Sequence, residues 1–586
     1  MLSFLVPALA AASVGDITVE PAFDVPATAE AMSAAAPYSL AESLSLDPAM
    51  RLSSAELGAV DQLRELEVWN TGGGEPKRNG FSRRLPRTIR ASLSAATATA
   101  TPSFADGGWT VRTVDQWLVW GTSIAVDGAW RTRIKLDHVN LPPGTRFWVW
   151  APGGEQTPFG LELLGGESEL WSPSTEGELV YLEVAAPLEG VEGDQTLGFQ
   201  ISEVLQLFSQ QSPESGECLI DATCVTTSTL DVIGSLRNAI AQLQYVKNGN
   251  SYVCSGGLLN DTDTATTIPY LLTANHCFST QSVASTLEAF WDYRTTTCGG
   301  SWPNLDTRPK SNGSTLLASS VQSDFTLARL NSIPAGRSLL GWTTATVANG
   351  AKLHRVSHPF PDGVSVPAPQ AYSSTLNATS PSLTCSTDSD GRPLGNLSKF
   401  IYSSMSDGGT YGGSSGSPVI LAGGYVVGQL FGACGTNNEG CNPAHYTVDG
   451  RFSATYPAIQ QYLSPTAGGP CVPGPDTACL LGSRFKVEVQ WTDFSSVTRN
   501  AHVASAGTSD TALFYWTNPN NWELLIKGIN ACTLNNKFWI YFAAATNVGY
   551  RVTVTDTQAG GSPKVYTNAL GNLAQATNDI NAFSCP

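Results

Sequence analysis

Three short stretches carry residue types whose spacing would allow nucleophilic chemistry. They are YLLTANHC at 270–277, SDFTLARL at 323–330 and YGGSSGSPV at 411–419. The first puts a histidine behind an apolar run, and the second puts an aspartate at the head of an alternating apolar strand. The third sets three serines among glycines, which is typical of a flexible linker or of a bend that presents a catalytic serine. A serine hydroxyl becomes a nucleophile when a histidine takes its proton and an acid orients that histidine.

Taken together, the three stretches resemble the motifs of chymotrypsin-like serine proteases. Those motifs are T-A-x-H-C, an aspartate followed by apolar residues and a leucine, and G-x-S-G-[GS]-P, in the order His, acid, Ser. The resemblance implies a catalytic triad of His276, Asp324 and Ser415. It also implies an oxyanion hole formed by the N–H groups of Gly413 and Ser415. The neighbouring serines of the loop would then be bystanders to the chemistry.

Across about 215–463 the chain is similar to bacterial lysyl endopeptidases, through CLIDATC at 218–224, VGQLFG at 427–432 and a later GRF. The resemblance implies three disulfide bonds in this region. The six cysteines that it leaves unassigned are then paired with one another. The expected bonds are Cys218–Cys434, Cys224–Cys298 and Cys254–Cys277 from the resemblance, then Cys385–Cys441, Cys471–Cys479 and Cys532–Cys585.

Two departures from lysine-cutting enzymes concern the specificity pocket. Those enzymes carry an acid shortly before a Gly-Arg pair, but the ungapped count falls here on Thr447, and Asp449 lies two residues later. Phe431 stands where they carry a histidine, in a strand whose Gln429, Phe431 and Gly432 are expected to bind substrate backbone. We therefore predict a serine endopeptidase whose pocket is not strongly basic-selective.

Two alternatives stay open. In one, Asp449 makes a lysine pocket and another protease matures the enzyme, because no Lys or Arg occurs from 147 to 236. In the other, the chain is a catalytically idle secreted binding or surface protein.

Ser414 replaces the aspartate that pairs with a new N-terminus in pancreatic-type enzymes, so another element must silence a precursor. Residues 14–212 are predicted to be that element, a prosegment acting as inhibitor or folding aid.

Composition narrows the class of protein. The net charge of -17 disfavours nucleic acid or an anionic membrane as a partner. Twelve cysteines, all from Cys218 onward, fit disulfide bonds in an oxidising compartment. No C-x-x-C pair and only six histidines argue against a zinc site, so neither metal nor cofactor is predicted. His358 is interpreted as structural because the triad is already complete.

The chain divides into four predicted parts. Residues 1–13 resemble a signal peptide that lacks its basic start, with a buried segment as the alternative. The prosegment 14–212 contains a helical stretch near 50–69 and a β domain at about 108–205. The protease domain, 213–463, is expected to form two antiparallel β-barrels, followed by a small β module at 464–586. The fold class is thus mainly β, and the protein is expected to be a secreted monomer that acts on proteins or peptides.

Overall fold

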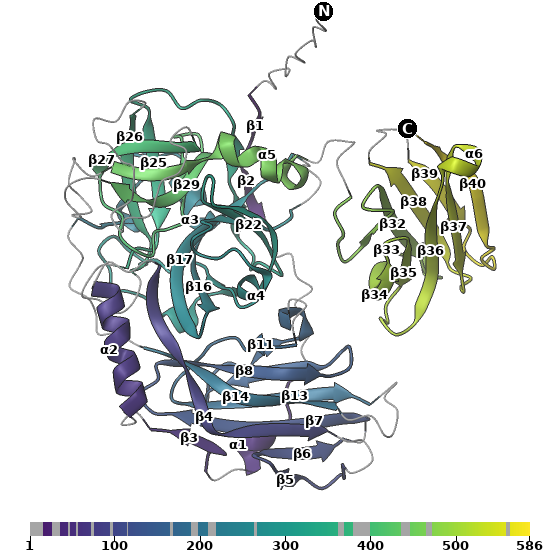
Figure 1. The fold of residues 1–586 in the computed structure, drawn as a ribbon, viewed down its shortest axis with the longest axis horizontal. Coiled ribbons are helices and arrows are strands. Elements are labelled where there is room, and N and C mark those ends of the chain that lie inside the picture. The colour runs from purple at the N-terminus through teal and green to yellow at the C-terminus, as the bar shows by residue number, and fades with distance from the viewer. Residues whose placement is uncertain are drawn as a thin grey trace, which may run out of the picture. The chain divides into compact units, whose positions relative to one another are not determined.

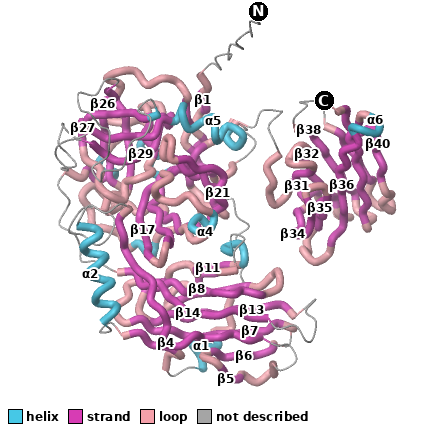
Figure 2. The backbone as a smooth tube through the Cα atoms, viewed as in Figure 1, coloured by secondary structure: helices cyan, strands magenta, loops and turns pink. Residues whose placement is uncertain are grey.

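The structure is a computed structural model of the 586-residue chain. It divides into two compact units, Met1–Ile459 and Gln460–Pro586, which are described separately. Strands dominate both units (Figure 2). The described residues are 16–25, 36–44, 47–53, 57–71, 76–93, 98–113, 115–164, 168–188, 197–208, 218–262, 267–360, 368–378, 399–434, 446–464, 471–557 and 563–585.

The N-terminal region of the first unit is a two-layered β structure. One layer has the strand order β10-β9-β13-β7-β6-β5, and the other is built from β11, β12, β8, β14 and β4. Trp120 and Phe147 of the first layer and Ile134 and Phe199 of the second share one buried core, which holds the layers together. The elements are α1 (Leu40–Leu44), β3 (Met50–Leu52), α2 (Leu57–Thr71), β4 (Lys77–Leu93), β5 (Ser103–Ala105), β6 (Gly108–Arg112), β7 (Trp117–Val126), β8 (Arg131–Asn140), β9 (Arg146–Trp150), β10 (Thr157–Phe159), η1 (Leu161–Leu164), β11 (Leu170–Trp171), β12 (Thr175–Glu176), β13 (Leu179–Pro187) and β14 (Leu197–Leu207).

The β structure of this region begins earlier in the chain than the predicted 108–205. β4 runs through the basic stretch that starts at Lys77, and Figure 1 shows it reaching from the N-terminal layers to the next domain. There it pairs with β17 (Asn250–Leu259), placing Phe81 opposite Asn250 and Lys77 opposite Val253. One sheet therefore continues from the N-terminal region into the first barrel.

The first barrel closes around a core that includes Tyr245, Phe278 and Trp291. β18 pairs with β17 and β22, β22 pairs with β21, and β19 links β16 to β20. A single residue, Gly313 at φ 73, separates β20 from β21, so the chain turns there and completes the ring. Its elements are α3 (Ile233–Ala239), β16 (Ile240–Lys247), β17 (Asn250–Leu259), β18 (Tyr270–Thr273), α4 (Gln281–Ala284), β19 (Glu288–Phe290), η3 (Leu305–Thr307), β20 (Lys310–Asn312), β21 (Ser314–Ser320) and β22 (Phe325–Leu330).

The strands of the second barrel pair in the order β29-β28-β25-β26-β27-β30. The last strand, β30, also pairs with the first, β29, so hydrogen-bonded strand pairs close the barrel. The two barrels match the predicted mainly β, double-barrel fold class. The elements from the linker onward are β23 (Arg337–Leu339), β24 (Gly341–Thr343), β25 (Lys352–Ser357), β26 (Ala371–Ala378), β27 (Phe400–Asp407), β28 (Pro418–Ile420), β29 (Tyr425–Cys434), β30 (Tyr446–Arg451) and α5 (Phe452–Leu463).

Three short segments attach further parts of the chain to these barrels. β1 (Thr18–Val19) and β2 (Ala22–Val25) pair with β24 and β23, so the start of the described chain also binds the protease-like part. β15 (Ile220–Asp221) pairs with β26 and leads into η2 (Ala222–Cys224). Residues 1–13 and most of the predicted linker at 208–217 lie outside the described residues.

The second unit is a β module made of two five-stranded sheets with a shared core that includes Phe485, Phe514 and Phe538. In the described part of the chain, no helix is long and apolar enough to cross a membrane. The elements are β31 (Thr477–Leu480), β32 (Phe485–Thr492), β33 (Thr498–Asn500), β34 (His502–Thr508), β35 (Thr511–Tyr515), β36 (Trp522–Ala531), α6 (Cys532–Asn535), β37 (Lys537–Ala544), β38 (Gly549–Asp556), β39 (Lys564–Asn568) and β40 (Thr577–Ser584).

Candidate active site

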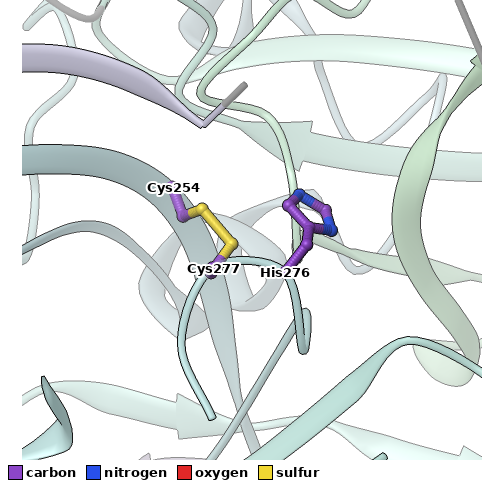
Figure 3. A group of neighbouring side chains, drawn as sticks. All are labelled: Cys254, His276 and Cys277. Atoms are coloured by element: carbon purple, nitrogen blue, oxygen red, sulfur yellow. A yellow bond between two sulfur atoms is a disulfide. The ribbon is translucent and has the colours of Figure 1, made fainter. Parts of the chain in front are cut away.

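His276 lies in the turn that follows β18, directly before a disulfide-bonded cysteine. Cys277 is bonded to Cys254 of β17, with Cα atoms 6.4 Å apart, and Figure 3 shows this bridge beside the His276 ring. The bridge closes a loop of 23 residues, which contributes about 3 kcal/mol in the chain-entropy model. The turn that carries His276 is thereby fixed to the barrel wall.

Asp324 binds His276 twice. Its Oδ1 accepts a hydrogen bond from the His276 backbone N–H at 2.9 Å, and its Oδ2 lies 2.7 Å from His276 Nδ1. Asp324 is buried and has φ 50, a left-handed conformation that aspartate tolerates better than most residues. The Gln429 side-chain amide donates to the Ser323 carbonyl at 2.7 Å and so holds the segment from the second barrel. Ring orientation and tautomer of His276 are therefore set by one carboxylate.

Ser415 lies in a tight loop before β28, between two glycines with positive φ. Gly413 has φ 86 and Gly416 has φ 80. A Cβ at Gly416 would lie 2.1 Å from Thr273 Oγ1, and one at Gly413 would lie 2.8 Å from the His358 carbonyl oxygen. Both positions therefore require glycine for conformation and for space.

The backbone of this loop is anchored through its carbonyls and leaves two amides available. Ser255 donates its N–H to the Ser415 carbonyl at 2.8 Å and its hydroxyl to the Gly413 carbonyl at 2.9 Å. Within the described residues, the N–H groups of Gly413 and Ser415 have no acceptor in the protein. Two amides that are fixed but unpaired are what an oxyanion hole requires.

The second ring nitrogen of His276 is also available. Nε2 is buried and has no hydrogen-bond partner in the part of the chain that the structure describes, so it is not bonded to the Ser415 hydroxyl. The backbone of Ser415 is nevertheless next to the histidine turn, because its carbonyl oxygen lies 3.9 Å from Cys277 Sγ. In a substrate-free site, bonds between nucleophile and base are often loose.

Of the two other serines in the loop, each has a partner away from His276. The Ser414 hydroxyl accepts a hydrogen bond from Ser357 at 3.0 Å, and Ser414 is fully buried. The Ser417 hydroxyl donates to the Ser414 carbonyl at 2.7 Å and accepts from Arg355 at 3.0 Å. Both side chains support the loop.

Asp449, predicted as a substrate-binding residue, is buried and paired with an arginine inside the protein. Its Oδ1 accepts a hydrogen bond from Arg355 Nη2 of β25, and both side chains are almost completely buried. Burial raises the pKa of Asp449, and the Arg355 charge opposes that rise. The same guanidinium also donates a hydrogen bond from Nη1 to the Ser417 carbonyl at 2.6 Å. Among the described residues, Oδ2 of Asp449 is buried and has no hydrogen-bond partner, so the carboxylate is not exposed on the surface.

Thr447 is also fully buried, and its hydroxyl donates to the Ser403 carbonyl at 3.4 Å. The rings of Phe431 and His276 form a T-shaped contact with centroids 5.9 Å apart, and Phe431 belongs to an apolar cluster with Phe400 and Val448. Gln429 pairs with Pro418 of β28 and Gly450 of β30. Gly432 lies beyond this point, where β30 is the only strand that pairs with it in the described part of the chain.

The disulfide bonds follow the expected pairs wherever the structure describes them. Cys224–Cys298, Cys254–Cys277, Cys471–Cys479 and Cys532–Cys585 are formed. Cys218 and Cys434 are each disulfide-bonded. Cys385 and Cys441 lie outside the described residues. Cys254, His276 and Cys277 lie close enough together for a metal, but both cysteines are used in their disulfide and provide no thiolate.

Neither Arg355 nor Ser255 was predicted from the sequence. Both donate hydrogen bonds to backbone carbonyls of the loop that carries Ser415. The available signal for Arg355 is an arginine inside the strand-like stretch LHRVSH, between His354 and Val356. Such a residue is rarely buried unless it is paired, and the sequence alone does not name the partner.

Comparison with known proteins supports the resemblance. Residues 212–447 match the family model described as lysyl endopeptidase, C-terminal domain. The chain resembles lysyl endopeptidases. The lysyl endopeptidase of Pseudomonas aeruginosa is 28% identical over 351 residues, covering 57% of this chain and 71% of that protein. Both findings indicate a serine protease of the lysyl endopeptidase-like kind.

Among solved structures, a thermostable serine protease AL20 from an extremophilic microorganism aligns with 39% of this chain and 98% of its own. Its sequence identity is 14% and the TM-score is 0.26, which is too low to bear on the fold. The lysyl endopeptidase-like assignment therefore rests on the sequence matches.

Proposed function

We propose that the protein is a secreted serine endopeptidase that hydrolyses peptide bonds through an acyl-enzyme on Ser415. The observation that carries the proposal is the two-point attachment of His276 to Asp324 beside the glycine-bounded Ser415 loop. The similarity to lysyl endopeptidases supports the same reaction class.

Ser415 Oγ attacks the peptide carbonyl carbon while its proton passes to His276 Nε2, the buried ring nitrogen that has no other partner among the described residues. The carbonyl oxygen becomes an oxyanion and accepts hydrogen bonds from the N–H groups of Gly413 and Ser415. His276 then gives the proton to the leaving amine, and the C–N bond breaks. A water molecule then attacks the carbonyl carbon of the acyl ester while His276 takes its proton. His276 returns that proton to Ser415 Oγ as the ester C–O bond breaks, which releases the carboxylic acid product and restores the serine. Asp324 stabilises the imidazolium in both steps.

We assign no strong preference for basic residues to this enzyme. Asp449 is the acid nearest in sequence to the expected pocket position, and the Arg355 guanidinium already occupies one of its oxygens. The residue beside His276 is the neutral Phe431, which packs into a buried apolar cluster with Phe400 and Val448. Lysine specificity is the competing proposal, and the match to lysyl endopeptidases favours it.

Substrate is proposed to bind as an added antiparallel strand along β29 near Gly432, beyond the last residue that pairs with β28. Such binding reads the backbone of an extended peptide and depends little on side chains. It suits an enzyme that digests unfolded protein.

The N-terminal region, 14–212, is proposed to be a prosegment of the precursor. Its β4 extends the barrel sheet through β17, and its Arg133 donates to the Thr286 carbonyl at 2.8 Å. Removal of this region requires a cut near 208–217. Because no Lys or Arg occurs from 147 to 236, self-processing there needs an enzyme that is not restricted to basic residues. The disulfide bonds suit an oxidising, extracellular setting.

A cleavage-site profile tests the proposal. The processed enzyme and its Ser415→Ala variant are incubated with a denatured protein mixture, and new N-termini are read by mass spectrometry. Cuts after apolar or small residues that are lost in Ser415→Ala support the proposal. Cuts confined to bonds after lysine overturn the specificity assignment while leaving the serine mechanism in place, and cuts that persist in Ser415→Ala overturn the mechanism.

A further inference from the structure

An arginine-lined hollow lies on the first barrel, apart from the residues of the proposed reaction. Its volume is about 520 Å³, and its walls include Arg237, Arg294 and Arg308 together with Asn238, Thr223 and Asp292. Three arginines around one hollow are unusual in a chain that has only 32 basic residues and a net charge of -17. Guanidinium groups that converge on an open space are suited to anions with several oxygens.

The acids at this hollow do not neutralise all of its arginines. Asp292 pairs with Arg294 at 3.1 Å and with Arg337 at 2.5 Å. Arg237 donates only to the Ile233 carbonyl, and Arg308 only to the hydroxyl of Thr307 next to it. Within the described residues, neither Arg237 nor Arg308 forms an ion pair. These two guanidiniums keep donors available for a ligand.

The arginines of this hollow repel one another. Burial lowers the pKa of Arg294, Asp292 opposes this effect, and the positive charges of Arg237, Arg337 and Arg308 lower it further. An anion bound between them would relieve this repulsion.

The walls of the hollow are fixed in advance. The disulfide Cys224–Cys298 joins the segment of Thr223 to the loop of Thr295 and Thr296. Across the same junction, Asp221 accepts hydrogen bonds from Thr223 N–H at 2.9 Å, the Thr295 hydroxyl at 2.6 Å and Gly299 N–H at 3.0 Å. Arg294 Nη1 is held by Asn238 at 3.0 Å. A preformed wall lowers the entropic cost of binding.

We propose that this hollow is a binding site for a multivalent oxyanion group, a phosphate or sulfate, held by Arg237, Arg294 and Arg308. The site is independent of the proposed peptidase activity, since no triad residue lines it. Its volume exceeds that of one tetrahedral anion, so a pyrophosphate is expected to bind more tightly than inorganic phosphate or sulfate.

Titration calorimetry on the full-length Ser415→Ala protein tests the proposal with pyrophosphate, phosphate and sulfate at constant ionic strength. We expect saturable binding of pyrophosphate at one site per chain. Arg308→Gln removes a side chain whose only hydrogen bonds are to Thr307, so the fold is expected to persist and affinity to weaken by about tenfold or more. Arg237→Gln together with Arg308→Gln should abolish binding.

The matched control is Arg499→Gln with Arg551→Gln, which removes the same charge from the C-terminal unit. Binding that survives the loss of Arg237 and Arg308, or that falls equally in the control, overturns the proposal. Absence of saturable binding to the parent protein also overturns it. Chloride titrated at equal ionic strength gives the baseline for non-specific charge effects.

Discussion

At the scale of the residue, Asp324 is the group that decides whether His276 can act as a base. Its two oxygens receive two different N–H groups of the histidine, 2.9 and 2.7 Å away. We expect Asp324→Asn to keep the fold but to lower kcat by about 10⁴-fold, because an amide favours the wrong imidazole tautomer. Steady-state hydrolysis of a peptide ester measures this effect. A loss smaller than tenfold would contradict the role given to Asp324.

A second residue-scale prediction concerns His358, which lies immediately after β25 and is fully buried. It stacks on Tyr293, its Nδ1 lies 3.3 Å from the Ala368 carbonyl oxygen, and burial lowers its pKa to about 3. An unfolded histidine has a pKa of about 6.5, so the unfolded chain binds the proton more readily. The free energy of unfolding should therefore fall as pH drops below 6.5 toward 3, by up to about 1.4 kcal/mol per unit.

Urea unfolding of Ser415→Ala between pH 7 and 4 checks this dependence without self-digestion. His358→Asn retains a donor toward Ala368 but has no titrating ring. It should show a shallower fall of stability with acid than the parent. Equal slopes in the two proteins would show that other groups dominate the acid response.

At the scale of the element, the ion pair between Arg355 and Asp449 joins β25 to β30 inside the second barrel. Arg355→Met leaves a buried carboxylate without its partner and should lower the free energy of unfolding by about 3–5 kcal/mol. The double variant Arg355→Met with Asp449→Leu removes both charges and should recover most of that loss. Denaturant midpoints of the single and double variants measure the difference. A double variant as unstable as Arg355→Met would contradict the pairing.

The sequence could predict those features of the site that depend on short, continuous motifs and on their order along the chain. The motifs around His276, Asp324 and Ser415 are short and continuous, so their place at strand ends could be read directly. The pair of Arg355 and Asp449 joins positions 94 residues apart, and no local pattern connects them. β4 could not be predicted either, because several of its buried residues are polar, Lys77, Asn79 and Arg83 among them, and its pairing with β17 is non-local.

At the scale of the whole molecule, the N-terminal region and the first barrel share a buried group of charges. Arg131 pairs with Asp306, Arg133 lies 3.7 Å from Glu288, and Lys310 lies 3.4 Å from the same carboxylate. Burial alone would raise the pKa of Glu288, but Lys310, Arg133 and Arg131 together hold it at about 2. The N-terminal region thus compensates charges that the barrel has buried.

Arg133→Ala should loosen this junction in the unprocessed Ser415→Ala chain. It removes the bonds to Ser172 and Thr286 as well as a charge facing Glu288, and should cost about 3 kcal/mol of unfolding free energy. Arg51→Ala is the control, since its pair with Asp127 is exposed and should contribute less than about 1 kcal/mol. Hydrogen exchange across β4 reports the junction itself. Unchanged protection of β4 in Arg133→Ala would mean that the charges do not hold the two parts together.

Covalent labelling shows whether His276 and Asp324 activate Ser415. The processed enzyme, Ser415→Ala and Asp324→Asn are each treated with a fluorophosphonate, and the adduct is located by peptide mass spectrometry. We expect this activation to give one adduct, on Ser415, absent from Ser415→Ala and formed far more slowly in Asp324→Asn. An unlabelled Ser415, or labelling of Ser414 or Ser417 instead, would contradict it and favour a catalytically idle protein or a different nucleophile.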